Sequence, residues 1–344
     1  AVVIRTTRGL ADFILATTGD DRGPVVVGRD ARPSSPTFLA DTVGVLAAAG
    51  LSVVYLDEPM PTPIIAFATK ELGASAGIVI TASHNPPYDN GYKVYDGRGV
   101  QIVSPTDQHI AEAIASVGPA SDVPRVDPGS AHPLIGLLRA DLRDRYFAEV
   151  ARSIPGVSGD RSIRIVYTAM HGVGGRFVAM VLDRFGFRNV HPVASQFEPD
   201  GRFPTVSFPN PEEPGALDLS HELAGSLDAH LVLANDPDAD RLAVSLPDGA
   251  GGWRPLTGNQ IGVLLADFLL QHGTSFKPIV INSIVSSPML DAIAATHGAT
   301  YARTLTGFSP IFTWPLLAML LAAAWALWQP AAAQRPWPRM AALA

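Results

Sequence analysis

The chain contains no cysteine, and only 17% of its 344 residues are charged. Without cysteine it can form no disulfide and use no thiolate in catalysis, which agrees with a cytoplasmic enzyme. Lys and Arg number 25 against 32 Asp and Glu, so the net charge is −7. A basic excess of the kind that binds nucleic acid or an anionic membrane is missing, and phosphate binding would have to be local. We therefore expect no nucleic-acid partner.

The first residues also lack the pattern of a secretory leader. They read Ala-Val-Val-Ile-Arg, without a basic region followed by an apolar core. The chain does not begin with Met, which suggests a fragment or a processed chain. An apolar content of 47% over 344 residues is enough for two or three domains with real cores.

Apolar runs that suit buried strands alternate with segments of helical periodicity over most of the chain. This alternation predicts βαβ units, in which ligand loops gather at the carboxyl ends of parallel strands. A Pro- and Gly-rich run at 118–133 marks a linker. We therefore expect domains at 1–133 and 134–272 and a partial third domain at 273–310, with one or two helices over 134–154.

A serine loop, residues 81–91, follows the apolar run at 76–80. Two prolines and an Asn-Gly pair give this loop a fixed, irregular shape, so it can aim a nucleophile. His84 and Lys93 lie near Ser83 in the sequence and could move protons or balance the charge of a phosphate. Alternatively, the loop is a structured turn in which Ser83 and His84 only satisfy backbone groups.

An acidic loop, residues 235–241, reads Asn-Asp-Pro-Asp-Ala-Asp-Arg and follows the apolar run at 231–234. Side chains two apart lie on the same side of an extended backbone, so the three carboxylates should converge, and their repulsion calls for a cation. Mg²⁺ fits, because it prefers carboxylate and phosphate oxygens. A calcium-binding helix-loop-helix does not fit, since Arg241 stands at the sixth position and Pro247 at the twelfth. A solvated acidic turn stays open.

The serine loop, the Asn-Gly-Tyr-Lys that follows it and the Asp-Pro-Asp-Ala-Asp-Arg of the acidic loop together resemble the α-D-phosphohexomutase superfamily, the phosphoglucomutase and phosphomannomutase enzymes. The resemblance runs from about residue 25 to residue 308. It implies an α/β fold of consecutive βα domains with mixed sheets and an incomplete third domain. It also implies an isomerase of carbohydrate metabolism that moves a phosphoryl group between the 1-hydroxyl and a distal hydroxyl of a sugar phosphate, through phosphoserine and a sugar 1,6-bisphosphate.

The resemblance also implies roles for individual residues. Ser83 would carry the phosphate, and His84 and Lys93 would assist proton transfer. Mg²⁺ would be held by Ser83, Asp236, Asp238 and Asp240. Phosphate contacts would come from Arg29, Arg32, Arg241, Thr306 and Gly307. From the residues alone, Arg29 and Arg32 could steady the phosphate or the local fold, and Arg241 could contact the transferring oxygens or pair with an aspartate.

Two other segments are less informative. A Gly-rich turn at 172–175 favours tight strand-to-helix packing over anion binding, and the preceding His171 is expected to be structural. A proline-rich segment, residues 197–214, is too irregular for a helix. Long irregular segments are often functional, but the sequence assigns this one no definite role.

The end of the chain departs from the family pattern. The family would place a lysine where Ser309 stands, and its usual Gly-Thr-Ser-Gly-like opening is also missing, so we expect truncation at both ends. Residues 311–344 begin with an uncharged apolar stretch, which favours an out-of-frame product over a membrane anchor. Two alternatives to a working enzyme stay open: a Mg²⁺-binding phosphoprotein fragment without turnover, and a membrane-attached interaction module. The oligomeric state and the sugar are not predicted.

Overall fold

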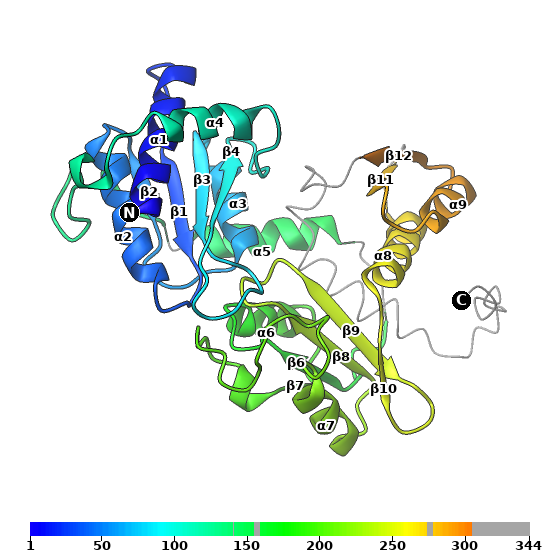
Figure 1. The fold of residues 1–344 in the computed structure, drawn as a ribbon. Helices are drawn as coiled ribbons and strands as arrows, with labels where there is room; N and C mark the ends of the chain where they lie inside the picture. The colour runs from blue at the N-terminus through cyan, green and yellow to red at the C-terminus, as the bar shows by residue number, and fades with distance from the viewer. Residues whose placement is uncertain (140, 155–158, 274–277, 305–344) are drawn as a thin grey trace.

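The computed structural model describes residues 1–139, 141–154, 159–273 and 278–304. They form two five-stranded sheets and one two-stranded sheet with helices packed against them (Figure 1). The prediction of an α/β fold with mixed sheets is confirmed. Thr306, Gly307 and the tail at 311–344 lie outside the described residues. In the described part of the chain no helix is both long and apolar enough to cross a bilayer.

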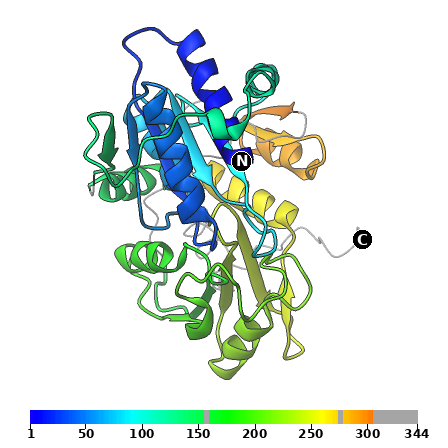
Figure 2. The ribbon, with the colours of Figure 1, turned by 60° about the vertical axis from the view of Figure 1, so that its left-hand side comes forward.

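The first sheet has the strand order β4-β3-β1-β2-β5. Strand β4 is antiparallel to β3, and the other neighbours pair in parallel. Helices α1, α2 and α4 pack on one face and α3 on the other (Figure 2). The elements are α1 (Val2–Thr17), β1 (Val25–Arg29), α2 (Ser35–Ala48), β2 (Val53–Tyr55), α3 (Thr62–Glu71), β3 (Ala76–Ile80), β4 (Tyr92–Asp96), α4 (Thr106–Ala115) and β5 (Ile135–Leu137).

Strand β1 shows why this sheet is buried on both faces. Val25 and Val27 pack in the core cluster that contains α1 and α2, whereas Val26 packs in the cluster that contains α3. Successive side chains of a strand point to opposite faces, so a strand between two helical layers is apolar at every position. The sequence Val-Val-Val therefore forms a central strand.

The expected helix over 134–154 is wrong in its first part. Residues 135–137 form β5, and only then does helix α5 (Leu142–Ser153) begin. The amide of Val53 donates to Leu134 O and the amide of Leu138 donates to Tyr55 O, which extends the pairing of β5 with β2. This pairing joins segments far apart in the sequence and overrides the local pattern. The first sheet thus includes a strand from beyond residue 133, and the domain boundary there stays a proposal.

The second sheet has the order β10-β9-β8-β6-β7. Strands β6, β7 and β8 are parallel, and β9 and β10 form an antiparallel hairpin that continues from β8. The elements are β6 (Ile165–Thr168), α6 (Gly175–Arg184), β7 (Val190–Pro192), α7 (Asp218–Ser226), β8 (Leu231–Asn235), β9 (Leu242–Pro247) and β10 (Trp253–Pro255).

The third sheet is a parallel pair of strands, β11 (Ile279–Ser283) and β12 (Thr300–Thr304). Helix α9 (Met289–Thr296) connects them. Helix α8 (Gly258–His272) begins with a capping box, in which Thr257 accepts from the amide of Gln260. It packs against α9 and also contributes Phe268 to the main core.

The first two sheets share one core. Phe67 of α3 and Tyr146 of α5 meet edge to face, with ring centroids 5.4 Å apart. A single cluster of buried side chains continues from there to Ile165 of β6 and Leu231 of β8. In Figure 1, α5 lies between the two sheets. This contact brings the loop after β3 to face the loop after β8.

Candidate active site

The serine loop begins directly after β3, and its backbone geometry is unusual at Ser83. Ser83 has a φ of +51°, in the left-handed region that is uncommon for residues other than glycine. Its amide donates to Thr81 Oγ1 at 2.9 Å. Gly91 lies against the same loop, because a Cβ there would be 2.5 Å from Thr81 O. The loop is therefore compact, and the Ser83 side chain is 8% exposed.

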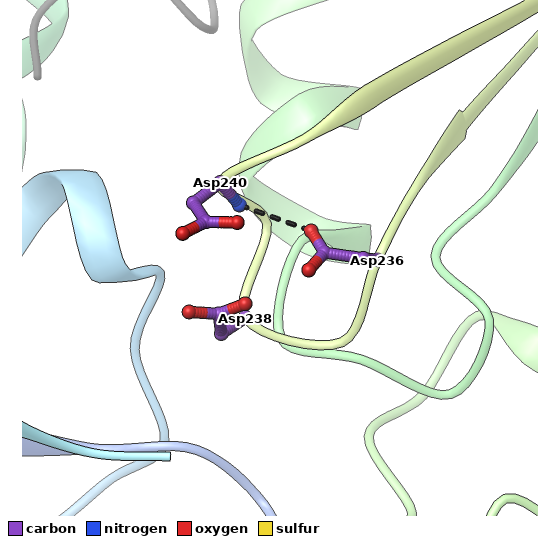
Figure 3. A group of neighbouring side chains, drawn as sticks. All are labelled: Asp236, Asp238 and Asp240. Atoms are coloured by element: carbon purple, nitrogen blue, oxygen red, sulfur yellow. Dashed lines mark hydrogen bonds between the residues drawn. The ribbon is translucent and has the colours of Figure 1, made fainter. Parts of the chain in front are cut away.

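The acidic loop forms a turn, so the expected extended backbone is wrong. The amide of Ala239 donates to Asp236 O at 2.9 Å, and Ala239 has a φ of +55°. Asp236 Oδ1 accepts from the amides of Asp240 at 3.2 Å and Arg241 at 3.0 Å. One carboxylate oxygen from each aspartate lies within 4.8 Å of the others (Figure 3). The predicted convergence is present, but the turn produces it.

The Gly-rich turn at 172–175 packs under the acidic loop. A Cβ at Gly172 would lie 2.4 Å from Pro237 Cα, and one at Gly174 would lie 3.2 Å from Ala239 Cβ. The amide of Val173 donates to Pro237 O at 2.8 Å. These glycines let two backbones approach closely. Close packing was expected between a strand and a helix, whereas these contacts join the turn to the acidic loop.

The two loops meet across the interface between the first and second sheets. Ser83 Oγ donates to Asp236 Oδ2 at 2.8 Å. Lys93 of β4 reaches the same loop, and its Nζ donates to Asp238 Oδ2 and Asp240 Oδ2, each at 2.7 Å. A hydroxyl, an ammonium and three carboxylates from two units thus form one cluster.

The electrostatics of this cluster are dominated by burial and repulsion. Burial, and then the charges of Asp238 and Asp240, raise the pKa of Asp236 well above its usual range. Burial disfavours the ammonium of Lys93, but the same two carboxylates outweigh it and raise the pKa of Lys93. Burial likewise opposes the charge of Asp238, yet Lys93 lowers the pKa of Asp238 below its usual range. Burial, and then the charge of Asp238, raise the pKa of Asp240 as well. With one ammonium beside them, the three carboxyl groups are therefore not all favoured in the ionised form without a further cation.

These residues fit a hard divalent cation such as Mg²⁺. The Oδ1 atoms of Asp238 and Asp240 are buried and accept no hydrogen bond from any described residue. A buried charged oxygen without a hydrogen-bond partner costs free energy, and a bound cation would remove this cost because its charge is opposite to that of the carboxylates. All the ligand atoms are oxygens, the type that Mg²⁺ prefers. A cation would compete with Lys93 for Asp238 and Asp240.

Comparison with known proteins agrees with this site. Residues 1–120, 144–249 and 257–313 match the models of phosphoglucomutase/phosphomannomutase alpha/beta/alpha domains I, II and III. The chain belongs to the phosphoglucomutase/phosphomannomutase family. The resemblance seen in the sequence is thereby confirmed.

Individual relatives carry several different names. The chain is 42% identical over 316 residues to a "Probable phosphomannomutase" of Haemophilus influenzae, a match that covers 90% of this chain and 63% of that protein. It is 37% identical over 326 residues to the mouse phosphopentomutase, covering 89% of this chain and 52% of that protein. The crystal structure of a phosphoglucomutase/phosphomannomutase family protein from Burkholderia thailandensis is 26% identical, with a TM-score of 0.69, covering 89% of this chain and 62% of that one. The chain thus spans 63% or less of the length of these relatives.

The other predicted residues of this family member lie around the cluster in different settings. Arg241 is adjacent to it, with Nε 4.0 Å from Asp240 Oδ1 and a side chain that is 39% exposed. His84 Nδ1 is buried and has no hydrogen-bond partner among the described residues. Burial, and then the charge of Arg241, lower the pKa of His84. The His84 ring lies 6.2 Å from that of Phe208, in the proline-rich segment.

The two arginines of the first sheet differ from each other. Arg29 is half-buried, and its Nη1 donates to Asp30 O at 3.1 Å. Burial lowers the pKa of Arg29. Arg32 is fully buried, and its Nη2 donates to Ser83 O at 2.8 Å. Of the two roles expected for Arg32, support of the local fold is the one that these contacts favour.

Thr62 belongs to the site but has no signal in a sequence motif. It is the first residue of α3, and its Oγ1 donates to Asp238 Oδ2 at 2.6 Å. Its amide donates to Asp238 O at 3.0 Å, so the first sheet's helix docks directly on the acidic loop. The available clue was topological, because α3 begins soon after the carboxyl end of β2, at the same edge of the sheet as Ser83.

Proposed function

We propose that this chain transfers a phosphoryl group between two hydroxyls of a sugar phosphate through a phosphorylated Ser83. One observation carries the proposal: the 2.8 Å hydrogen bond from Ser83 Oγ to Asp236 Oδ2, which joins a nucleophile on one unit to a carboxylate cluster on another. Two of the relatives named above are a probable phosphomannomutase and a phosphopentomutase, names that refer to a hexose and a pentose phosphate, and this supports the same class of substrate.

The transfer consists of two displacements. In the first, a sugar hydroxyl oxygen bonds to the phosphorus of phospho-Ser83 while the bond from phosphorus to Ser83 Oγ breaks, which yields a sugar bisphosphate such as a 1,6-bisphosphate. The proton of the sugar hydroxyl passes to a base, and Ser83 Oγ takes up a proton as it leaves. In the second, Ser83 Oγ gives up that proton and bonds to the other phosphorus of the reoriented bisphosphate while the bond from that phosphorus to the sugar oxygen breaks, and this sugar oxygen takes up a proton to become the free hydroxyl of the product. Atoms and charges balance over the cycle.

We assign the proton transfers to His84 and the charge balance to Lys93. Because burial lowers the pKa of His84, its imidazole is neutral near pH 7 and can accept a proton. Lys93 remains an ammonium while it contacts two carboxylates, so it neutralises charge and does not serve as the base. Arg241 is the cation that we assign to the transferring phosphoryl oxygens.

Asp236, Asp238 and Asp240, with an oxygen on Ser83, would hold Mg²⁺, which when bound offsets the negative charge that phosphoryl transfer concentrates at the site. The aspartates' own task is to keep their oxygens converged in a turn that the protein has already formed. This preorganisation saves the free energy that loose ligands would lose on ordering.

The test is to incubate the chain with Mg²⁺ and glucose 1,6-bisphosphate and to locate bound phosphate by mass spectrometry. We expect one phosphate on Ser83 of the parental chain and none on Ser83→Ala. Ser116→Ala, at the exposed end of α4, is the matched control and should be phosphorylated on Ser83 like the parental chain. A parental chain that takes no phosphate on Ser83 would refute the proposal.

Turnover is measured separately, as conversion of glucose 1-phosphate, mannose 1-phosphate and ribose 1-phosphate in the presence of a trace of the matching bisphosphate. Conversion of one of them identifies the sugar. Phosphorylation of Ser83 without conversion of any of them would favour the alternative function, a Mg²⁺-binding phosphoprotein that does not turn over.

A further inference from the structure

We propose that Arg32 is a positioning residue that sets the serine loop for phosphoryl transfer, and that the proline-rich segment of the second unit holds Arg32 in place. The inference rests on the proposed function, since it concerns how Ser83 is aimed. It assigns a role to the proline-rich segment, for which the sequence alone predicts no definite role.

All the side-chain N–H groups of Arg32 are used in hydrogen bonds to the serine loop and to one carboxylate. A guanidinium has five N–H groups in a rigid planar fork. Nε donates to Asp30 Oδ2 at 3.0 Å, and the two terminal nitrogens donate to four loop carbonyls, those of Ser83 at 2.8 Å, Asn85 at 2.7 Å, Asp89 at 3.1 Å and Pro86. No N–H is left for a phosphate, so Arg32 acts through the loop.

The contact with Ser83 O bears on the conformation of the nucleophile. Ser83 has a left-handed backbone, which costs free energy for a residue with a Cβ and persists only where neighbours enforce it. Arg32 holds the Ser83 carbonyl on one side while Asp236 accepts from the Ser83 hydroxyl on the other. Loss of the guanidinium would let the serine loop relax, and Ser83 Oγ would then move away from its position beside Asp236.

The proline-rich segment covers Arg32 from the second unit. The Phe203 ring lies over the guanidinium, with its centroid 5.2 Å from Arg32 Cζ. Gly201 approaches even more closely, because a Cβ there would lie 2.3 Å from Ala31 O and 2.4 Å from Arg32 Cα. Only a glycine permits this contact, which presses the backbone of one unit on that of the other.

A polar network that is buried at Thr168 and Gln196 anchors the segment at the carboxyl end of β6. Thr205 Oγ1 accepts from Gln196 Nε2 at 2.9 Å and is 2.8 Å from His171 Nε2. Gln196 Oε1 accepts from Thr168 Oγ1 at 2.6 Å, and the amide of Asp200 donates to His171 O at 2.9 Å. The segment is therefore tied to the same unit that carries the acidic loop. Through its contacts with Arg32, the proline-rich segment fixes the position of the serine loop relative to the carboxylates of the acidic loop.

The experiment measures the rate at which glucose 1,6-bisphosphate phosphorylates Ser83 in Arg32→Lys and Arg32→Ala. Lys keeps the charge but cannot reproduce the fork. Since a misplacement of about 1 Å can slow a reaction about 100-fold, we expect a loss of about tenfold for R32K and about 100-fold for R32A. Mn²⁺ binding to the acidic loop, followed by electron paramagnetic resonance, should remain at the parental affinity in R32K. A general loss of fold would weaken both.

Gly201→Ala disturbs the packing of the proline-rich segment on Arg32 but leaves the guanidinium itself unchanged. We therefore expect it to slow Ser83 phosphorylation as R32K does. Gly225→Ala is the matched control, because a Cβ at Gly225 meets nothing within 4 Å, and it should retain the parental rate. R32K and G201A that are both phosphorylated at the parental rate would overturn the inference while leaving the proposed function intact. A parental chain that is never phosphorylated would instead overturn the proposed function.

Discussion

Replacement of Thr62 by valine tests whether the first unit orients the acidic loop. Valine keeps the shape of threonine and removes only the hydroxyl, which is buried and donates to Asp238 Oδ2 at 2.6 Å. The hydrogen bond from the Thr62 amide to Asp238 O is retained, so α3 should still dock. The substitution thus isolates a single charge-assisted hydrogen bond.

The magnitude follows from the partner's charge and burial. Hydrogen bonds to charged groups contribute about 1.5–3 kcal/mol, and Asp238 keeps Lys93 as a second donor, so we expect T62V to lower the free energy of unfolding by about 2 kcal/mol. Groups that orient a metal ligand typically affect affinity 10- to 100-fold when removed. We therefore expect Mg²⁺ to bind about tenfold more weakly to T62V.

Urea unfolding followed by circular dichroism measures the first quantity, and isothermal titration calorimetry with Mg²⁺ measures the second. Thr62→Ser should restore both. Thr106→Val is the control, because Thr106 is also the first residue of a helix but its hydroxyl donates to no described residue. T62V indistinguishable from T106V in both measurements would refute the orienting role of Thr62.

Three further predictions concern the same region. Lys93→Met removes one partner of a buried ion pair, so without divalent ions we expect the free energy of unfolding to fall by about 3–5 kcal/mol, with partial recovery in Mg²⁺, both read from urea unfolding. Gly172→Ala should weaken Mg²⁺ binding in calorimetry, since its Cβ would lie 2.4 Å from Pro237 Cα, whereas Gly262→Ala, with nothing within 4 Å, should not. Burial lowers the pKa of His171 in the folded chain, so as the pH falls below about 6.5 His171 is protonated in the unfolded chain before it is protonated in the folded chain. The free energy of unfolding therefore decreases in this pH range. His171→Gln should lose less unfolding free energy than the parental chain between pH 7.5 and pH 5.5; an equal loss would contradict the assignment.

The strands and the two reactive loops could be predicted from the sequence because their signals are local. A strand that is buried on both faces of a sheet must be apolar at every position. The sequence shows this pattern in the three valines at 25–27 and in the apolar runs before Ser83 and Asp236. Proline and Asn-Gly pairs likewise fix where a strand must stop. The alternation of strands and helices then placed both loops at carboxyl edges of their sheets.

The details of the acidic loop needed the fold. The sequence predicts convergence of its carboxylates from an extended backbone, yet a turn with a left-handed Ala239 produces it, closed from below by Gly172. Strand β5 was missed for a related reason, since three residues gain their conformation from pairing with β2, which lies far away in the chain.

What the tertiary structure alone decided is which residues of one unit serve the other. Arg32, Thr62 and Phe203 stand in no recognisable motif with their partners, because their contacts join segments separated by 50 to more than 170 residues. The sequence by itself determined the chemistry available, a hydroxyl, an ammonium and three carboxylates, since that is a matter of residue type. Their relative placement depends on the packing of α3 against α5 and of the proline-rich segment on Arg32, and such packing is settled only when the whole core forms.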